Sequence, residues 1–156
     1  MSRNLVRATL ATISVVLLNV FGSASFAQEV KPDSLVGDDL HYLGYVMITG
    51  DTTAWVSMKS DDVYHLSKAM FFRDPKVLSY IKNDDLYFLG AALIYADDVE
   101  LEKIAKNDLY YLGKAIFEKQ TSLLENIKSD DLYYLGKGLI LKDANYLDQM
   151  STRSKK

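Results

Sequence analysis

The chain contains the stretch NDLYYLGK (residues 107–114) and, 23 positions later, the nearly identical stretch DDLYYLGK (residues 130–137). Three earlier copies keep the same spacing without gaps and begin at Asp38, Asp61 and Asp84. If each copy is numbered from column 1 to column 23, column 2 is always Asp, column 6 is always Leu, and column 7 is Gly except at Ser67. Five copies fill residues 38–152, which is the signature of a repeat architecture.

Each copy has the pattern of two short helices joined by a tight turn. Columns 3, 6, 7 and 10 follow the spacing of one helix face, and the acidic or amide residue at column 1 suits an N-cap. We expect a first helix over columns 2–12 (residues 108–118 in the fourth copy), with this face turned toward the second helix. A break follows at columns 13 and 14, where Asp74-Pro75 is a typical helix start. We expect a second helix of about eight residues after the break, with apolar columns 18 and 21.

One such hairpin cannot bury its own apolar face, because helices this short are marginal in isolation. Stacking hairpins side by side solves the problem, and small residues at columns 7 and 9 would let neighbours approach closely. The sequence therefore predicts an all-α fold, a right- or left-handed α-solenoid of five tandem 23-residue helix-turn-helix repeats. Residues 28–37 form a lead-in, in which Pro32 to Gly37 is expected to cap the first repeat, and residues 153–156 form a polar tail.

The first 27 residues are predicted to be a cleaved signal peptide. Arg3 and Arg7 precede an apolar run over residues 8–21, and small residues then provide a cleavage site after Ala27. Fourteen residues are too few to span a bilayer as a helix, which needs about 20. We therefore expect a periplasmic or secreted protein with no membrane span after cleavage. Loss of the two arginines changes the formal charge from −3 to −5.

Composition and motifs argue against several classes of function. Eighteen basic and 21 acidic side chains leave no basic field for nucleic acid. The absence of cysteine excludes disulfides, thiolate metal sites and thiol catalysis, and two histidines are few for a metal centre. The sequence has no glycine-rich phosphate loop, nucleophile elbow or HExxH motif. We therefore predict that the protein is not an enzyme and has no catalytic residue, no cofactor and no metal site.

Acidic residues gather at columns 1 and 2, which places them at the start of each first helix. They are Asp38, Asp39, Asp61, Asp62, Asp84, Asp85, Asp108, Asp130 and Asp131. Helix capping explains them better than calcium binding, because no D-x-[DN]-x-[DN]-G loop is present. A lytic enzyme or hydrolase that uses such carboxylates (Asp85, for example) is the alternative from a different class, but it would need two carboxyls in unlike environments.

The chain resembles the short helical-hairpin solenoids, among them the tetratricopeptide-like and leucine-rich-variant repeats. The residues that carry the resemblance are the Tyr-Tyr-Leu-Gly-Lys stretches that begin at Tyr110 and Tyr133, together with the segment Asp74-Pro75-Lys76-Val77-Leu78. The resemblance covers residues 38–152, although the tetratricopeptide period is 34 rather than 23. It implies a platform for binding rather than a catalyst, and it assigns no functional residue.

Columns 5, 8 and 12 lie on the helix face opposite the apolar one and are unusually aromatic, with lysines beside them. Binding surfaces favour aromatic side chains and long cations, so we predict that this face binds a partner. The predicted residues are Tyr42, Tyr45, His65, Lys68, Phe72, Phe88, Tyr95, Tyr111, Lys114, Tyr134 and Lys137.

We expect the partner to be another protein, with the chain acting as an adaptor or as an inhibitor of the immunity type. The alternative is a periplasmic glycan-binding module, in which Tyr42, Phe88, Tyr111 and Tyr134 stack on the sugar rings of peptidoglycan. The same columns could instead belong to the core between repeats or to a homodimer interface. Column 4, which is Tyr in four copies and His41 in the first, is expected to form an aromatic stack between repeats.

Overall fold

The computed structural model describes residues 37–150, in which α-helices alternate with short 3-10 helices. The α-helices are α1 (Gly37–Thr49), α2 (Asp61–Phe72), α3 (Asp84–Tyr95), α4 (Asn107–Glu118) and α5 (Asp130–Leu141). The 3-10 helices are η1 (Thr52–Ser57), η2 (Pro75–Tyr80), η3 (Asp98–Lys103), η4 (Thr121–Asn126) and η5 (Ala144–Gln149). The described part of the chain contains no strand, and each copy of the repeat supplies one helix of each kind. The predicted all-α fold of five tandem repeats is confirmed.

Three predicted segments lie outside the described residues. They are the signal peptide at 1–27, the lead-in as far as residue 36, and the polar tail at 153–156. None of the helices between residues 37 and 150 has the length and apolar character needed to cross a membrane.

The second helix of each repeat is a six-residue 3-10 helix, shorter and tighter than the eight-residue helix predicted. In η2 the Asp74 carboxylate accepts a hydrogen bond from the Lys76 N–H at 3.0 Å, and the helix ends where the Ile81 N–H donates to Leu78. A 3-10 helix rises about 2.0 Å per residue, against 1.5 Å for an α-helix. Six residues in this form therefore return along more of the preceding α-helix than six α-helical residues would.

The α-helices also begin earlier than predicted, by one residue in α2 to α5 and by two in α1. The N-cap is column 23 rather than column 1, because the side chain of Ser60 accepts from the Val63 N–H at 3.3 Å. Asn83 and Ser129 cap α3 and α5 in the same way.

The α-helices end at column 12, as predicted, and the next residue, at column 13, adopts the left-handed backbone conformation. Gly50 has φ +77° there, but Arg73, Ala96, Lys119 and Lys142 have φ between 51° and 56°, a region that costs a residue with a Cβ about 1–2 kcal/mol.

We expect Ala96→Gly to raise the free energy of unfolding by about 0.5–1 kcal/mol, the relief of backbone strain less the greater entropy of glycine in the unfolded chain. Urea denaturation of both proteins measures the change. Gly50→Ala is the reverse test, because nothing lies within 4 Å of the added Cβ. Equal stability of Gly50→Ala and the unchanged protein would contradict the explanation.

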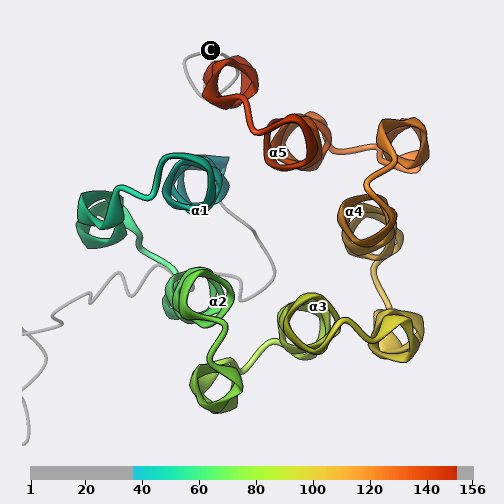
Figure 1. Ribbon diagram of the computed structural model, residues 1–156, viewed down its shortest axis with the longest axis horizontal. Coiled ribbons are helices and arrows are strands. Elements are labelled where there is room, and N and C mark those ends of the chain that lie inside the picture. Colours follow the sequence, from blue (N-terminus) through green and yellow to red (C-terminus); the bar gives the residue numbers. More distant parts are fainter. Residues whose placement is uncertain (1–36, 151–156) are drawn as a thin grey trace, which may run out of the picture. The chain divides into compact units, whose positions relative to one another are not determined.

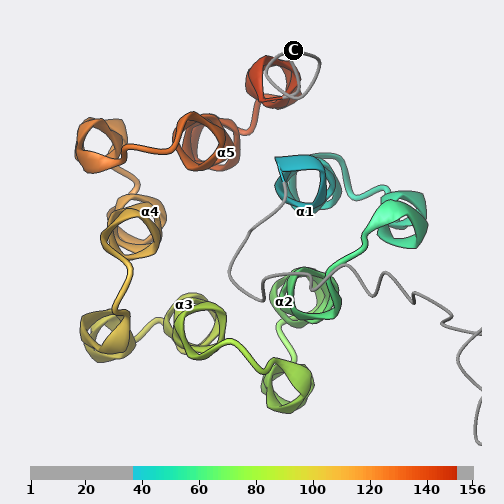
Figure 2. The ribbon, with the colours of Figure 1, turned by 180° about the vertical axis from the view of Figure 1, so that it is seen from behind.

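The repeats close into a ring, so that the first α-helix packs against the last (Figures 1 and 2). Every α-helix has two α-helical neighbours, and α1 lies between α2 and α5. The 3-10 helices lie outside the α-helices in Figure 1, and η5 packs on α1 as η2, η3 and η4 pack on the α-helix that follows them. At the closure, Nδ1 of His41 lies 3.2 Å from the backbone oxygen of Leu147, 106 positions later.

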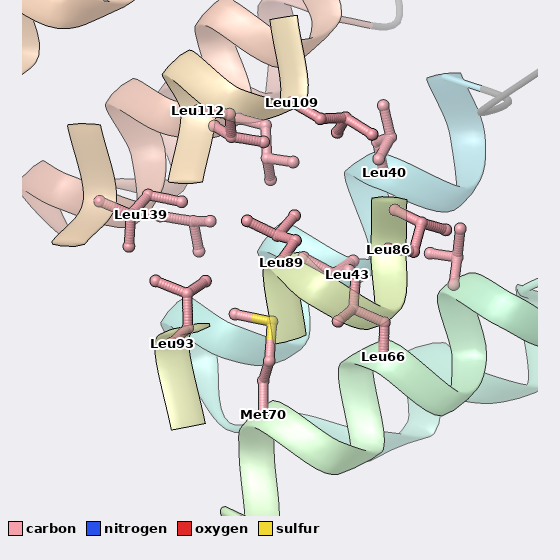
Figure 3. Close-up of a pocket in the computed structure, with 13 residues that line it drawn as sticks. Leu40, Leu43, Leu66, Met70, Leu86, Leu89, Leu93, Leu109, Leu112 and Leu139 are labelled. Carbon is pink, nitrogen blue, oxygen red and sulfur yellow. The ribbon is translucent and has the colours of Figure 1, made fainter. Parts of the chain in front are cut away.

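The centre of the ring is filled with side chains from columns 3, 6 and 10 of all five α-helices. Leu40, Leu66, Leu89 and Leu112 point toward one another there (Figure 3), and they leave a void of only about 20 Å³. The prediction that these columns face the second helix is therefore wrong. Ring closure gives them a shared interior instead, and the second helices pack on the outside.

The glycines at column 7 explain how the second helices pack. A Cβ added to Gly113 would come within 2.6 Å of the Leu101 side chain, which lies at column 18 of the preceding repeat. The same pairing joins Leu78 to Gly90, Leu124 to Gly136 and Leu147 to Gly44. The last pair joins the fifth repeat to the first. Column 7 was expected to let a neighbouring backbone approach closely, but what fills the space at these glycines is the side chain of a buried leucine from the neighbouring repeat.

The acidic residue at column 2 ties the start of one repeat to the start of the next. Asp39 accepts hydrogen bonds from the N–H groups of Lys59 (2.8 Å) and Ser60 (2.9 Å), and its side chain is fully buried. Asp62 and Asp108 make the equivalent pairs of bonds 20 and 21 residues along the chain. Column 2 therefore has a structural role beyond the favourable interaction with the helix dipole that its position suggests.

Candidate partner-binding surface

The predicted binding residues lie on the outer wall of the ring. Columns 3, 6 and 10 face the centre, so columns 5, 8 and 12 on the opposite side of each α-helix face outward, between consecutive 3-10 helices. Each α-helix carries its own group of them: Tyr42 and Tyr45; His65, Lys68 and Phe72; Phe88 and Tyr95; Tyr111 and Lys114; Tyr134 and Lys137. Because the array is a ring, these groups form a belt that points in five directions, and one flat partner cannot cover them all.

The column-5 aromatics are half-buried, and two of them, His65 and Phe88, contact the 3-10 helix of their own repeat. The His65 ring stacks on Tyr80 with 5.2 Å between centroids, and the Lys103 ammonium lies 5.4 Å from the centre of the Phe88 ring. Column 12 is more open, since Phe72 is 57% and Tyr95 59% exposed. Column 12 therefore offers the larger apolar area to a partner.

The column-8 lysines pair with the tyrosine one turn earlier in the same helix. Lys68 donates to the Tyr64 hydroxyl at 3.2 Å, and Lys114 donates to Tyr110 at 3.4 Å. The ammonium of Lys137 lies 4.7 Å from the centre of the Tyr133 ring. These tyrosine hydroxyls raise the pKa of Lys114 and of Lys137, chiefly through hydrogen bonding, which keeps both side chains cationic.

Because its tyrosines pair with the column-8 lysines, column 4 also belongs to the outer wall, although we did not include it in the predicted binding site. The tyrosine rings of this column meet their column-5 neighbours edge to face, as Tyr110 meets Tyr111 at 5.3 Å. Their hydroxyls also reach the preceding 3-10 helix, where Tyr110 donates to Glu102 at 3.3 Å and Tyr133 to Glu125 at 3.4 Å. At α4 and α5, column 4 therefore contacts the preceding repeat through a hydrogen bond from a tyrosine hydroxyl to a glutamate. The aromatic pairs that it forms there lie within a single helix.

One junction of the ring departs from the others, between η1 and α2. Trp55 takes the place of the column-18 leucine, and Ser67 takes the place of the column-7 glycine. The two exceptions meet, because the indole N–H of Trp55 donates to the Ser67 hydroxyl at 2.9 Å. None of the residues of η1 is buried, whereas η2, η3, η4 and η5 each bury their leucine.

Aromatic side chains gather around this exceptional pair. The Trp55 ring lies 5.6 Å from Phe71, 5.7 Å from Phe72 and 6.3 Å from Tyr64, measured between centroids. The Lys68 ammonium lies 5.8 Å from the Trp55 ring. Beside them Val56 is 90% exposed. We call Trp55, Val56, Tyr64, Lys68, Phe71 and Phe72 the Trp55 cluster.

The predicted set contains only Lys68 and Phe72 of this cluster. A signal for the rest is present in the repeat alignment, because Trp55 and Ser67 are the single exceptions in their columns. Sequence reasoning missed it because column 18 of one copy is not known to meet column 7 of the next until the packing is known.

The outer wall carries no arrangement of side chains that suggests a metal. Within residues 37–150, no group of three or more His, Asp or Glu side chains is placed to hold a metal ion. Comparison of the chain with models of protein families, with curated proteins and with solved structures finds no match.

Proposed function

We propose that this protein is a non-enzymatic, exported binding protein that engages another protein through the outer wall of its ring, with the Trp55 cluster as the anchor. The main observation behind the proposal is that one junction of the ring, between η1 and α2, lacks the leucine–glycine pair found at the other four. Four junctions bury a leucine on a glycine, whereas the fifth places a tryptophan, three further aromatic rings and an exposed valine at the surface.

The chemistry of the cluster is that of a binding hot spot. Tryptophan and tyrosine are enriched among the residues that dominate binding energy, and they act from the centre of a patch that excludes water. Phe72 and Val56 would supply such a patch, since 57% and 90% of their surfaces are exposed. Lys68 adds a cation that an acidic residue of the partner would pair with.

Export is part of the proposal and rests on the sequence of residues 1–27, with its basic start, apolar run and small residues before position 28. In the periplasm or outside the cell, a small ring of this kind would serve as an adaptor or as an inhibitor of an exported enzyme.

The double variant Trp55→Leu with Ser67→Gly tests the anchor without sacrificing the fold. It rebuilds the η1–α2 junction with the leucine–glycine pair found at the other junctions, so the helical circular dichroism should be unchanged. We expect capture of the partner from an envelope extract to fall at least tenfold, as the loss of a hot spot of about 2 kcal/mol requires.

A matched pair of substitutions tells which side of the ring is used. Tyr111→Ala with Tyr134→Ala alters the belt at α4 and α5 and leaves the Trp55 cluster intact. If capture survives the Trp55/Ser67 exchange and is lost in this second variant, the proposed anchor is wrong. Capture that soluble peptidoglycan fragments compete away would favour the glycan alternative instead.

A further inference from the structure

One end of the ring is open and apolar. At the ends of the α-helices where the chain turns into the 3-10 helices, a pocket of about 380 Å³ is lined by column-10 side chains from α1, α2, α3 and α4. They are Met47, Met70, Leu93 and Ile116, and the last three also line the leucine-filled centre. The pocket therefore has an apolar floor continuous with the core. Its volume is within the range of about 300–1,000 Å³ that small-molecule sites occupy.

The two charged residues in the lining of this pocket are both cations, Arg73 and Lys119. Both occupy column 13, where they hold the left-handed conformation with φ of 51° and 56°. A glycine would be less strained there, as Gly50 is in the first repeat. Neither side chain forms an ion pair with another residue in the described part of the chain.

Two acidic residues that follow column 13 at the pocket, Asp74 and Asp97, are already engaged. Asp74 follows Arg73, and its carboxylate accepts from the Lys76 N–H at 3.0 Å, while Asp97 accepts from Val99 at 3.0 Å. Lys119 is followed by the neutral Gln120, and Glu118 before it belongs to column 12 and lies with Lys114 beside a different pocket. The rim thus combines two unpaired cations with carboxylates that cap the 3-10 helices.

We propose that this pocket binds an amphiphilic anion of the fatty-acid class, with a single apolar tail on Met47, Met70, Leu93 and Ile116 and a carboxylate between Arg73 and Lys119. An apolar pocket contributes burial, and a few placed polar groups at its edge fix the orientation of the ligand. This site is separate from the Trp55 cluster, and it does not depend on the proposed function.

Both ends of the described chain lie at the end of the ring opposite the pocket. The first described residue, Gly37, is the start of α1. Column 22 of each repeat lies at the end of the ring where the α-helices start, since the Lys82 N–H donates to Asp62 near the start of α2. Met150, at column 21, is therefore also at the end opposite the pocket. An α-helix of 12 residues separates the two ends by about 18 Å.

Methionine methyl resonances of the full chain offer a direct test, because the chain carries its own controls. Met47 and Met70 line the pocket, whereas Met58 and Met150 follow 3-10 helices at column 21. In protein labelled with ¹³C at the methionine methyls, we expect added decanoate to shift the Met47 and Met70 signals in a saturable way and to leave Met58 and Met150 unchanged.

Ligands with the same tail separate burial from charge recognition. Decyl maltoside is neutral and decyltrimethylammonium is cationic, and we expect both to bind at least tenfold more weakly than decanoate when all are used as monomers. A hydrogen bond to a charged group is worth about 1.5–3 kcal/mol, which corresponds to that tenfold difference or more.

The double variant Arg73→Asn with Lys119→Asn should weaken decanoate binding at least tenfold, because asparagine is neutral and tolerates the left-handed conformation. Lys142→Asn is the matched control: it removes a cation from the same column and conformation but outside the pocket lining, and it should bind decanoate as the unchanged protein does. The proposal would be overturned if decanoate did not bind, or if it shifted the signals of Met47, Met58, Met70 and Met150 equally. It would also be overturned if decyl maltoside bound with the same affinity as decanoate, or if the double variant and Lys142→Asn lost affinity equally.

Discussion

Leu147→Ala should lower the free energy of unfolding by about 2–5 kcal/mol, the cost of a cavity at a fully buried leucine. Leu147 lies in the last 3-10 helix, yet it has no exposed surface, because it packs on Gly44 in the first α-helix as well as on its own repeat. Leu124 is equally buried at the junction of the fourth and fifth repeats. We therefore expect Leu124→Ala and Leu147→Ala to have similar costs in urea denaturation.

The comparison distinguishes a closed ring from an open array. In an open array η5 would have no following α-helix to pack on, and a leucine in it would lose little when shortened to alanine. A cost below about 1 kcal/mol for Leu147→Ala, beside 2–5 kcal/mol for Leu124→Ala, would contradict closure. Native-state hydrogen exchange gives a second measure, since closure should protect the Met150 amide, which bonds to Leu147, as well as the Ile127 amide, which bonds to Leu124.

The repeat itself could be predicted from the sequence because every copy keeps the residues that its own folding requires. Column 6 is leucine in all five copies because it fills the centre, and the break at columns 13 and 14 marks the turn that each hairpin needs. These requirements act within one copy or between adjacent copies, so alignment of the chain with itself reveals them.

Closure of the ring could not be predicted in the same way, because the curvature of an array depends on a small rotation between repeats that no single column encodes. A clue exists in hindsight. Terminal repeats of open arrays are usually altered into polar caps, whereas the first repeat here keeps Gly44 and the last keeps Leu147. Each retains its half of a leucine–glycine pair that an open array would leave incomplete.

The candidate surface was predicted only in part, for a related reason. The helical period correctly places columns 5, 8 and 12 opposite the apolar face, but it says nothing about the 3-10 helices that flank them. As a consequence, Tyr80 covers His65, whereas the Phe72 side chain remains exposed. The Trp55 cluster depends on a contact between two different columns of adjacent copies, which periodicity does not reveal.

Asp39→Ala should lower the free energy of unfolding by about 2–4 kcal/mol, because the carboxylate is the shared acceptor for two backbone N–H groups. Each buried donor left without an acceptor costs about 1–3 kcal/mol. The bonds from Lys59 and Ser60, at 2.8 and 2.9 Å, hold the loop that starts α2, so their loss should loosen the junction between the first two repeats. Asp39→Asn keeps one acceptor oxygen and should cost about half as much in thermal or urea denaturation.

Asp38→Ala is the matched control, since Asp38 lies one residue earlier in the first turn of α1 and is exposed. Both substitutions remove one negative charge from the same helix start, where a carboxylate contributes about 0.3–1 kcal/mol through the helix dipole. Equal losses for the two variants would mean that the dipole alone explains these acidic residues, and the tie between repeats would be wrong. A calcium site would give a different result again, because added Ca²⁺ would then raise the melting temperature of the unchanged protein and not that of Asp39→Asn. A large loss for Asp39→Ala, a small one for Asp38→Ala and no effect of Ca²⁺ would assign column 2 to joining repeats and column 1 to the dipole.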